Sequence, residues 1–542
     1  MKKIYIFILF LCFTVFAFSM SGKMKPQKDK IKYENQLGTV QLPEKYEDSV
    51  EGHLKYGLAL LHHMTYNEAR KEFSKATESD PTCALGYWGQ AMTYIHPLWS
   101  DPPSEEEFNK GMILIEEAKK YQKGKEVDYI RATESYYAAG KNENEKNNLV
   151  AFADGWKKIS LKYPNDPEAA SFYALSYLST ADPEDKSYEI QIKVGEITKN
   201  VLKIIPDHPG AHHYMIHAYD YPELAPMGLE ISKTYVEIAP EIPHALHMAS
   251  HIFTRLGLWE ESIVMNSRSA EAALKHPTQG TISLHYPHAV DYLIYAHLQK
   301  GEDLKAKEAL DELVAMEEDF QSHIAASYTF NAAPARLLLE RQNWDDAMSL
   351  EPWVPVNYDL NKFPAMEAIT YFAKGLGAAR IGNKSVADKS LQKLLELHDK
   401  IEATSPYWAK QIEIQSLSVM AWMTYISDKK KGIEIMKEAA LMEDTTEKHP
   451  VTPGEVLPAR ELYGDMLLDS KQYKEAQYEY QESLKRNKNR LNSLYGAGQA
   501  AEMQGDKLTA INYYEKVVDQ AKGADTEIVR VQHAKIYLMN NQ

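Results

Sequence analysis

Two pairs of histidines with the same internal spacing stand out in the central part of the chain. His213 and His217 are four residues apart, and His247 and His251 repeat this spacing 34 residues later. On an α-helix, a spacing of four places both side chains on one face. Two neighbouring helices with such pairs could hold a divalent transition metal, because neutral imidazole is a good ligand for zinc, copper, nickel and non-haem iron.

Further candidate ligands lie in the same region. His244 precedes the second pair, His288 and Asp291 belong to the next predicted repeat, and Asp220 follows the first pair. A carboxylate could be a ligand or could orient an imidazole ring. Three nitrogens and an open coordination position would permit hydrolytic or oxidative chemistry, whereas a closed site would be structural. Two other interpretations stay open: a groove that binds protons or a small ligand, and histidines that only pack.

The sequence does not support four other kinds of catalytic or phosphate-binding site. There is no GxSxG elbow and no acidic pair with the context of a glycosidase. The glycine-spaced segment Gly86–Met92 falls in a predicted helix without a preceding strand, which excludes a phosphate-binding loop. Cys83 has no visible base to activate it as a nucleophile. We therefore assign no catalytic residue and favour a protein that is not an enzyme.

The elements that must position the histidines are helices. Apolar residues recur with helical periodicity almost throughout. Small and aromatic residues also recur at the packing positions of paired helices: Gly57, Ala69, Phe73 and Ala76, then Gly464, Ala476, Tyr480 and Leu484, then Gly498, Ala510, Tyr514 and Val517. The last two sets are 34 residues apart, which predicts helix–turn–helix units that stack into an all-α solenoid of at least eight pairs.

This pattern resembles the tetratricopeptide repeat (TPR) family over most of residues 50–540. Three segments also resemble a bacterial subgroup of exported TPR proteins with histidine-rich central repeats: "DPTCALGYWGQAM" (Asp80–Met92), "HPGAHHYMIHAYD" (His208–Asp220) and "HALHMASHIFTRLGLWEES" (His244–Ser262). The resemblance implies helical hairpins whose first helices line a concave groove, partner proteins bound in that groove, and a role in scaffolding or assembly. It places the two histidine pairs on the groove side and implies no catalytic role.

The N-terminus has the pattern of a secretory signal peptide. Two lysines precede the apolar run Ile4–Phe18, and Ala17 and Ser19 form a small-x-small cleavage pattern. Residues 1–21 are therefore predicted to direct export to the periplasm, the cell envelope or the medium. Cys12 lies inside the apolar run, so lipid attachment is not expected. No later segment is long and apolar enough to span a membrane.

The remaining chain is predicted to divide at a proline-rich segment. A flexible leader at 22–50 precedes an N-terminal TPR-like solenoid at 51–351, which carries the histidine-rich repeats. A loop at 352–365 then leads to a C-terminal solenoid at 366–542. Only Cys83 would remain after signal cleavage, so no internal disulfide is expected.

The charge composition of the chain restricts the classes of molecule that it is expected to bind. The chain has 61 basic and 77 acidic residues and a net charge of −16, which argues against nucleic acid and anionic lipid. The leading hypothesis is a non-catalytic binding or scaffold module, in an envelope or polysaccharide-utilisation system. The alternative is a metal-dependent enzyme or metal-binding protein that uses the histidine-lined groove. A glycan-binding lipoprotein is the third hypothesis, and the missing lipid-attachment cysteine counts against it.

Overall fold

The computed structural model describes residues 36–99, 101–141 and 145–541. The predicted signal peptide and residues 22–35 of the leader lie outside this part. The described residues form 25 α-helices and one short 3-10 helix, and they contain no strand. Thr278 and Thr281, and Ile282 and Phe320, form isolated β-bridges only.

The first group of helices runs to the middle of the chain: α1 (Asp48–His62), α2 (Tyr66–Ser79), α3 (Ala84–Met92), α4 (Glu105–Tyr121), α5 (Glu126–Ala138), α6 (Lys146–Lys162), α7 (Pro167–Leu178), α8 (Glu189–Ile204), α9 (Pro209–Tyr219), α10 (Ala225–Ile238), α11 (Pro243–Leu256), α12 (Trp259–Lys275) and α13 (His285–Lys300).

The second group completes the array: α14 (Asp303–Val314), α15 (Ile324–Leu339), α16 (Trp344–Met348), η1 (Leu360–Lys362), α17 (Pro364–Ile381), α18 (Lys384–Ile401), α19 (Pro406–Tyr425), α20 (Lys429–Asp444), α21 (Ala459–Asp469), α22 (Tyr473–Arg486), α23 (Leu491–Gln504), α24 (Lys507–Gln520) and α25 (Val529–Asn541).

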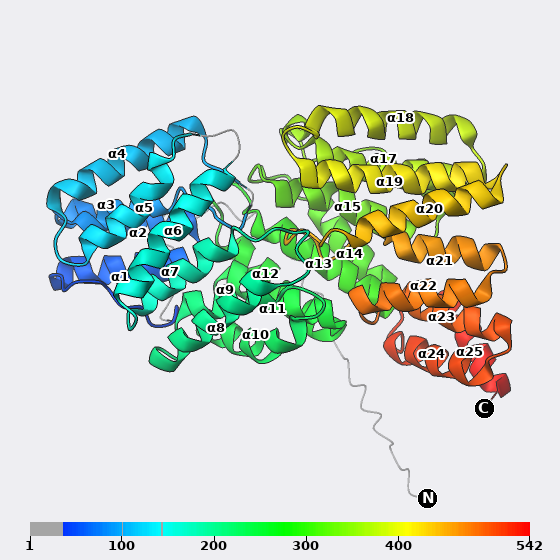
Figure 1. Cartoon of the computed structure of the whole chain (residues 1–542). Coiled ribbons are helices and arrows are strands. Elements are labelled where there is room, and N and C mark those ends of the chain that lie inside the picture. The colour runs from blue at the N-terminus through cyan, green and yellow to red at the C-terminus, as the bar shows by residue number, and fades with distance from the viewer. Residues whose placement is uncertain (1–35, 100, 142–144, 542) are drawn as a thin grey trace, which may run out of the picture. The chain divides into compact units, whose positions relative to one another are not determined.

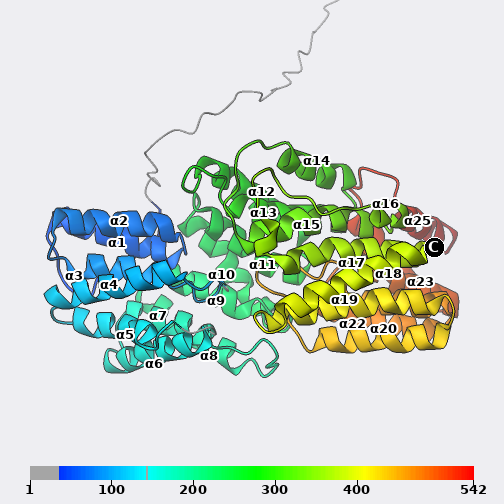
Figure 2. The ribbon, with the colours of Figure 1, turned by 90° about the horizontal axis from the view of Figure 1, so that it is seen from above.

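Consecutive helices pack as antiparallel pairs, as Figures 1 and 2 show. The first helix of each pair also contacts the first helix of a neighbouring pair. One uninterrupted series of such contacts runs through α7, α9, α11, α13, α15, α17, α19, α21 and α23, and α1 also contacts α9. The inner layer of the solenoid therefore consists of first helices, and it contains α9, α11 and α13, which carry the histidines.

The predicted packing positions are buried where paired helices meet. Ala69, Phe73 and Ala76 on α2 are fully buried. A Cβ built on Gly57 of α1 would lie 3.1 Å from the Phe73 ring. Glycine at this position thus lets the two helices approach across an aromatic ring, as the repeat pattern requires. The all-α fold built of tetratricopeptide-type helical hairpins is confirmed.

Two further features bear on the predicted organisation. The described residues from 36 onward belong to one compact unit. The segment 352–365 contains η1 and the start of α17; its role as a boundary between two halves stays a prediction. No helix in the described residues is long and apolar enough to cross a membrane.

A long connection joins α20 to α21. We call residues 445–458 the cross-loop, because it reaches the inner helices of the histidine-rich repeats. The Tyr292 hydroxyl of α13 donates to the Thr452 carbonyl at 2.7 Å. The Arg336 guanidinium of α15 donates to the carbonyls of Gly454 and Glu455, both at 2.8 Å. This loop therefore packs against α13, which carries His288, and against α15.

Candidate metal centre

The first group of histidines, trio one, joins two neighbouring repeats. His213 and His217 lie on one face of α9, and His244 comes from the first turn of α11. The Nε2 atom of His213 lies 3.1 Å from Nε2 of His244 and 3.2 Å from Nε2 of His217. One nitrogen from each ring lies within 4.8 Å of the other two. All three side chains are buried.

The second group, trio two, has the same arrangement one repeat further along the solenoid. His247 and His251 lie on one face of α11, and His288 comes from α13. The Nε2 atoms of His247 and His251 are 3.0 Å apart, and the rings of His247 and His288 have centroids 4.1 Å apart. Again one nitrogen from each ring lies within 4.8 Å of the others.

Local sequence explains why these helices present the rings in this way. Proline occupies the first position of α9 and of α11, where its fixed φ starts a helix and no backbone donor is lost. Gly257 ends α11 with a φ of +66°, a conformation that glycine adopts without strain. The start of each helix and the end of α11 are therefore defined by local sequence. The spacing of four residues then places the two histidine rings of each pair on the same face of their helix.

The structure brings all four principal histidines together but sorts them into two trios. His244 and His288, the weaker candidates, complete these trios as third members. The closest approach between trios joins His217 and His251, whose ring centroids are 6.1 Å apart. The histidines are buried and do not line an open groove. The cross-loop lies close to them, because it contacts Asp220 and Tyr292, which in turn contact His251 and His247.

The hydrogen bonds of trio two determine where its protons are. His247 Nδ1 lies 2.8 Å from the amide oxygen of Asn266, whose nitrogen donates to the Ser262 carbonyl. His251 Nδ1 lies 2.8 Å from a carboxylate oxygen of Asp220. Both oxygens only accept, so each neutral ring carries its proton on Nδ1. Two bare Nε2 lone pairs therefore face each other at 3.0 Å.

In trio one, too, the ring nitrogens cannot all form hydrogen bonds with one another. His213 Nδ1 donates to the backbone carbonyl of His62 at 2.7 Å, which leaves its Nε2 without a proton. That nitrogen has a single lone pair, yet His217 and His244 both turn an Nε2 atom toward it. Nδ1 of His244 has no hydrogen-bond partner although it is buried. Hydrogen bonding alone therefore leaves the nitrogens of this trio poorly satisfied.

Burial keeps these rings neutral. It lowers the pKa of His213 to about 3, and it lowers the pKa values of His217, His247 and His288 well below the usual value. The pKa of His251 is also lowered by burial, although the adjacent carboxylate of Asp220 opposes the shift. Neutral imidazole is the form that coordinates a metal.

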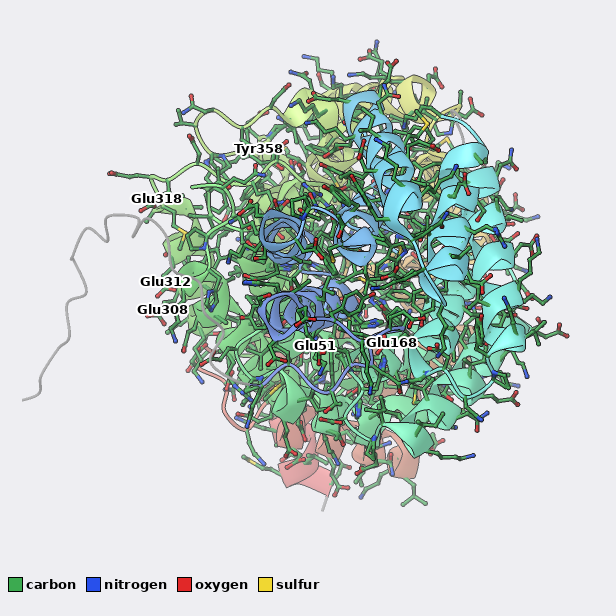
Figure 3. All side chains as sticks on the ribbon, turned by 90° about the vertical axis from the view of Figure 1, so that its left-hand side faces the viewer. Glu51, Glu168, Glu308, Glu312, Glu318 and Tyr358 are labelled. Atoms are coloured by element: carbon green, nitrogen blue, oxygen red, sulfur yellow. The ribbon has the colours of Figure 1, made fainter. Side chains whose placement is uncertain are left out.

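A third cluster serves as an internal comparison. Glu168 of α7 lies between His62 and His208, 2.6 Å from Nε2 of His62 and 3.2 Å from Nε2 of His208. His208 Nδ1 accepts the Ala211 amide, so its Nε2 carries the proton that faces the carboxylate. Figure 3 marks Glu168, which is fully buried, and the exposed Glu308 and Glu312. This cluster differs from the trios in that a carboxylate faces both rings, although His208 Nε2 makes no hydrogen bond to it.

Asp291 lies outside both trios. Its carboxylate is 3.4 Å from the Arg336 guanidinium, and burial raises its pKa to about 6. Asp291 therefore pairs with Arg336 of α15 and not with the histidines. Asp220, in contrast, orients His251 in the way that a carboxylate behind a metal-binding imidazole does.

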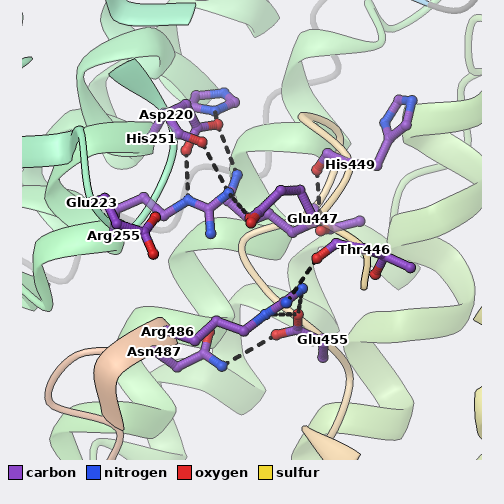
Figure 4. Close-up of polar contacts among 12 residues, drawn as sticks. Asp220, Glu223, His251, Arg255, Thr446, Glu447, His449, Glu455, Arg486 and Asn487 are labelled. Atoms are coloured by element: carbon purple, nitrogen blue, oxygen red, sulfur yellow. Dashed lines mark hydrogen bonds and ion pairs between the residues drawn. The ribbon is translucent and has the colours of Figure 1, made fainter. Parts of the chain in front are cut away.

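The sequence pattern indicated Asp220 as a carboxylate partner but not the cationic side chains that surround it. Asp220 accepts from Arg255 at 2.9 Å and from Lys448 of the cross-loop at 2.8 Å. Figure 4 shows Asp220 between His251 and Arg255, with Glu447 of the cross-loop nearby. Lys448 comes 197 positions after His251 in the sequence, so no local spacing could have revealed it.

Comparisons with known proteins do not assign this chain to a family. No family model and no curated protein matches the sequence. Among solved structures, the human IFIT1 dimer with PPP-AAAA has 15% sequence identity and a TM-score of 0.37, and it covers 88% of this chain and 91% of that chain. The human IFIT1 dimer with m7Gppp-AAAA has 14% identity and a TM-score of 0.36, with the same coverage. We transfer no ligand, partner or function from these proteins.

Proposed function

We propose that the protein is an exported, non-catalytic binding module of repeat architecture, and that its central repeats bind transition-metal ions through the two histidine trios. The observation that carries metal binding is the pair His247 and His251. Their neutral rings turn bare Nε2 atoms toward each other at 3.0 Å. A cation held by both lone pairs would replace this repulsion with two coordinate bonds.

The surroundings support the same function. Each trio supplies three imidazole nitrogens, and Asn266 and Asp220 hold two rings by the nitrogen that faces away from the trio. Such contacts fix the tautomer and the orientation of a metal-binding histidine. The cluster of Glu168, His62 and His208 differs in its inward-facing groups, because a carboxylate there faces the two Nε2 atoms and no pair of bare nitrogens is brought together.

Elemental analysis of protein purified without a polyhistidine tag tests the metal-binding part. We expect a transition metal to remain bound at neutral pH after dialysis. Replacing His247 and His251 together with alanine should lower the bound metal and leave the helical circular dichroism signal intact. His398→Ala on the distant α18 is the matched control and should retain the wild-type content. A wild-type protein that retains no metal, even after incubation with zinc, copper or iron, would show that the histidines only pack.

The export part of the proposal rests on the N-terminal sequence. A mature protein that begins near Met20 or Gly22 and carries no lipid would support it. Retention of the intact N-terminus in the producing cell would contradict it. An envelope or polysaccharide-utilisation system is the setting that we propose for the exported protein.

Partner proteins are the second class of ligand that we propose, because stacked helical hairpins offer extended surfaces for binding. The cross-loop lies against inner helices of the histidine-rich repeats. A partner would therefore bind other repeats or displace this loop. The negative net charge favours neutral or cationic partners over nucleic acid.

A further inference from the structure

We propose that the two trios form one binuclear centre that binds two copper ions in the cuprous state, one ion in each trio. This inference rests on the proposed metal binding and extends it to stoichiometry, metal identity and a shared site.

The placement of the trios on α11 supports a shared site. His244 completes trio one, whereas His247 and His251 belong to trio two, and all three lie on this helix within seven residues. Seven residues span about 10 Å along a helix. The trios are also in ring contact, because the ring centroid of His217 in trio one is 6.1 Å from that of His251 in trio two. Two ions bound here would occupy one compartment.

The chemistry of the donors supports a cation of low charge. Both trios consist of neutral imidazoles, and neither contains a carboxylate or a thiolate. The nearest carboxylate, Asp220, already has two cationic partners, Arg255 and Lys448. Two divalent ions would place four positive charges in a buried site without compensating anions, which is costly. Cuprous ions would halve this charge.

Aromatic rings surround the trios, and they supply no anion that could compensate the charge of a bound ion. The Trp99 ring packs edge-on against His244, with centroids 5.4 Å apart. The Tyr292 ring packs edge-on against His247 at 4.6 Å. Imidazole nitrogen is a suitable ligand for copper, and each trio offers three such nitrogens. Zinc in the same site would bring two positive charges and would take a water molecule or another added ligand in its fourth position.

The repeat register explains why the centre ends after two ions. Asp291 and Tyr295 on α13 lie four and eight residues after Pro287, as His247 and His251 lie four and eight residues after Pro243 on α11. An aspartate and a tyrosine therefore replace the two histidines, and the Asp291 carboxylate faces the Arg336 guanidinium of α15. A third trio cannot form at this position.

The test is an anaerobic titration of full-length, untagged protein with cuprous ion against a chromophoric chelator. We expect two tightly bound copper ions per chain. His244→Ala, which opens trio one, and His288→Ala, which opens trio two, should each bind one. His398→Ala, in an exposed cluster with Asp399 and Glu402, should still bind two. Circular dichroism monitors folding, and His244→Gln and His288→Gln replace any alanine variant that does not fold.

X-ray absorption of the doubly loaded wild-type protein supplies a readout that does not depend on variants. We expect a nitrogen-only first shell and a copper–copper contribution that disappears in the singly loaded variants. One copper ion per chain, two ions without this contribution, or zinc that displaces copper would overturn the binuclear copper proposal and leave metal binding intact. A protein that binds no transition metal at all would overturn both.

Discussion

Lys448 and Asp220 are 228 positions apart in the sequence, yet the Lys448 Nζ atom lies 2.8 Å from the Asp220 carboxylate. The same carboxylate oxygen accepts from His251 Nδ1. The cross-loop from the C-terminal part of the solenoid is thus joined directly to the ligand set of trio two. Burial lowers the pKa of Lys448 to about 8, although Asp220 raises it.

This contact predicts a large effect on stability. Lys448→Met keeps the length of the side chain but removes its charge from a buried pair. Loss of one partner from such a pair costs on the order of 3 kcal/mol. We expect a lower free energy of unfolding in chemical denaturation at pH 7. Lys410→Met removes a more exposed ion pair with Glu184 and should cost less than about 1 kcal/mol. Equal effects of the two variants would show that the cross-loop does not stabilise the fold.

Asn266 offers a test of ligand orientation. Asn266→Ala removes the oxygen that holds the Nδ1 proton of His247. Loss of such a contact typically lowers metal affinity by about 10–100-fold. We expect this change at trio two in a competition titration, with trio one unaffected. The control Asn200→Ala, an exposed residue on α8, should not alter affinity. Unchanged affinity in Asn266→Ala would show that His247 does not bind the metal.

Gly89 tests the close packing of the first repeats. A Cβ at Gly89 of α3 would overlap the ring of Phe73, which is fully buried on α2. Gly89→Ala should therefore lower the free energy of unfolding by about 1–3 kcal/mol. Gly52→Ala on α1 makes no contact and should raise it by about 0.5–1 kcal/mol, because alanine favours helix. Thermal or chemical unfolding distinguishes the two. A neutral Gly89→Ala variant would mean that α2 and α3 can separate without cost.

Acid should destabilise the metal-free protein. Burial lowers the pKa values of His63 and His285 to about 3, whereas in the unfolded chain each is near 6.5. Below pH 6.5 the unfolded state takes up protons that the folded state does not, so this contribution to stability is lost as pH falls from about 6.5 toward 3. Denaturation midpoints at pH 8, 7, 6 and 5, at constant ionic strength, measure this trend. A midpoint that rises between pH 7 and 5 would contradict it.

The sequence by itself determined the repeat architecture and the faces of the central helices. Helical periodicity and recurrent small and aromatic residues, such as Gly57 and Phe73, identify hairpins, because these residues interact with neighbours in the same or the next helix. The spacing of four within each histidine pair fixed a common face for the same reason. The sequence also indicates His244 and His288 as further candidate ligands, because they belong to the same repeats or to the adjacent one.

Only the tertiary structure decided how these residues are grouped. The division into two trios depends on the angle between α9, α11 and α13, which no spacing encodes. Asp291 faces Arg336 of α15 and not the histidines, and the carboxylate that orients His251 is paired with Lys448 of the cross-loop, 228 positions away. These contacts join residues far apart in sequence. They form because buried charges need partners, and the fold supplies those partners through long-range packing.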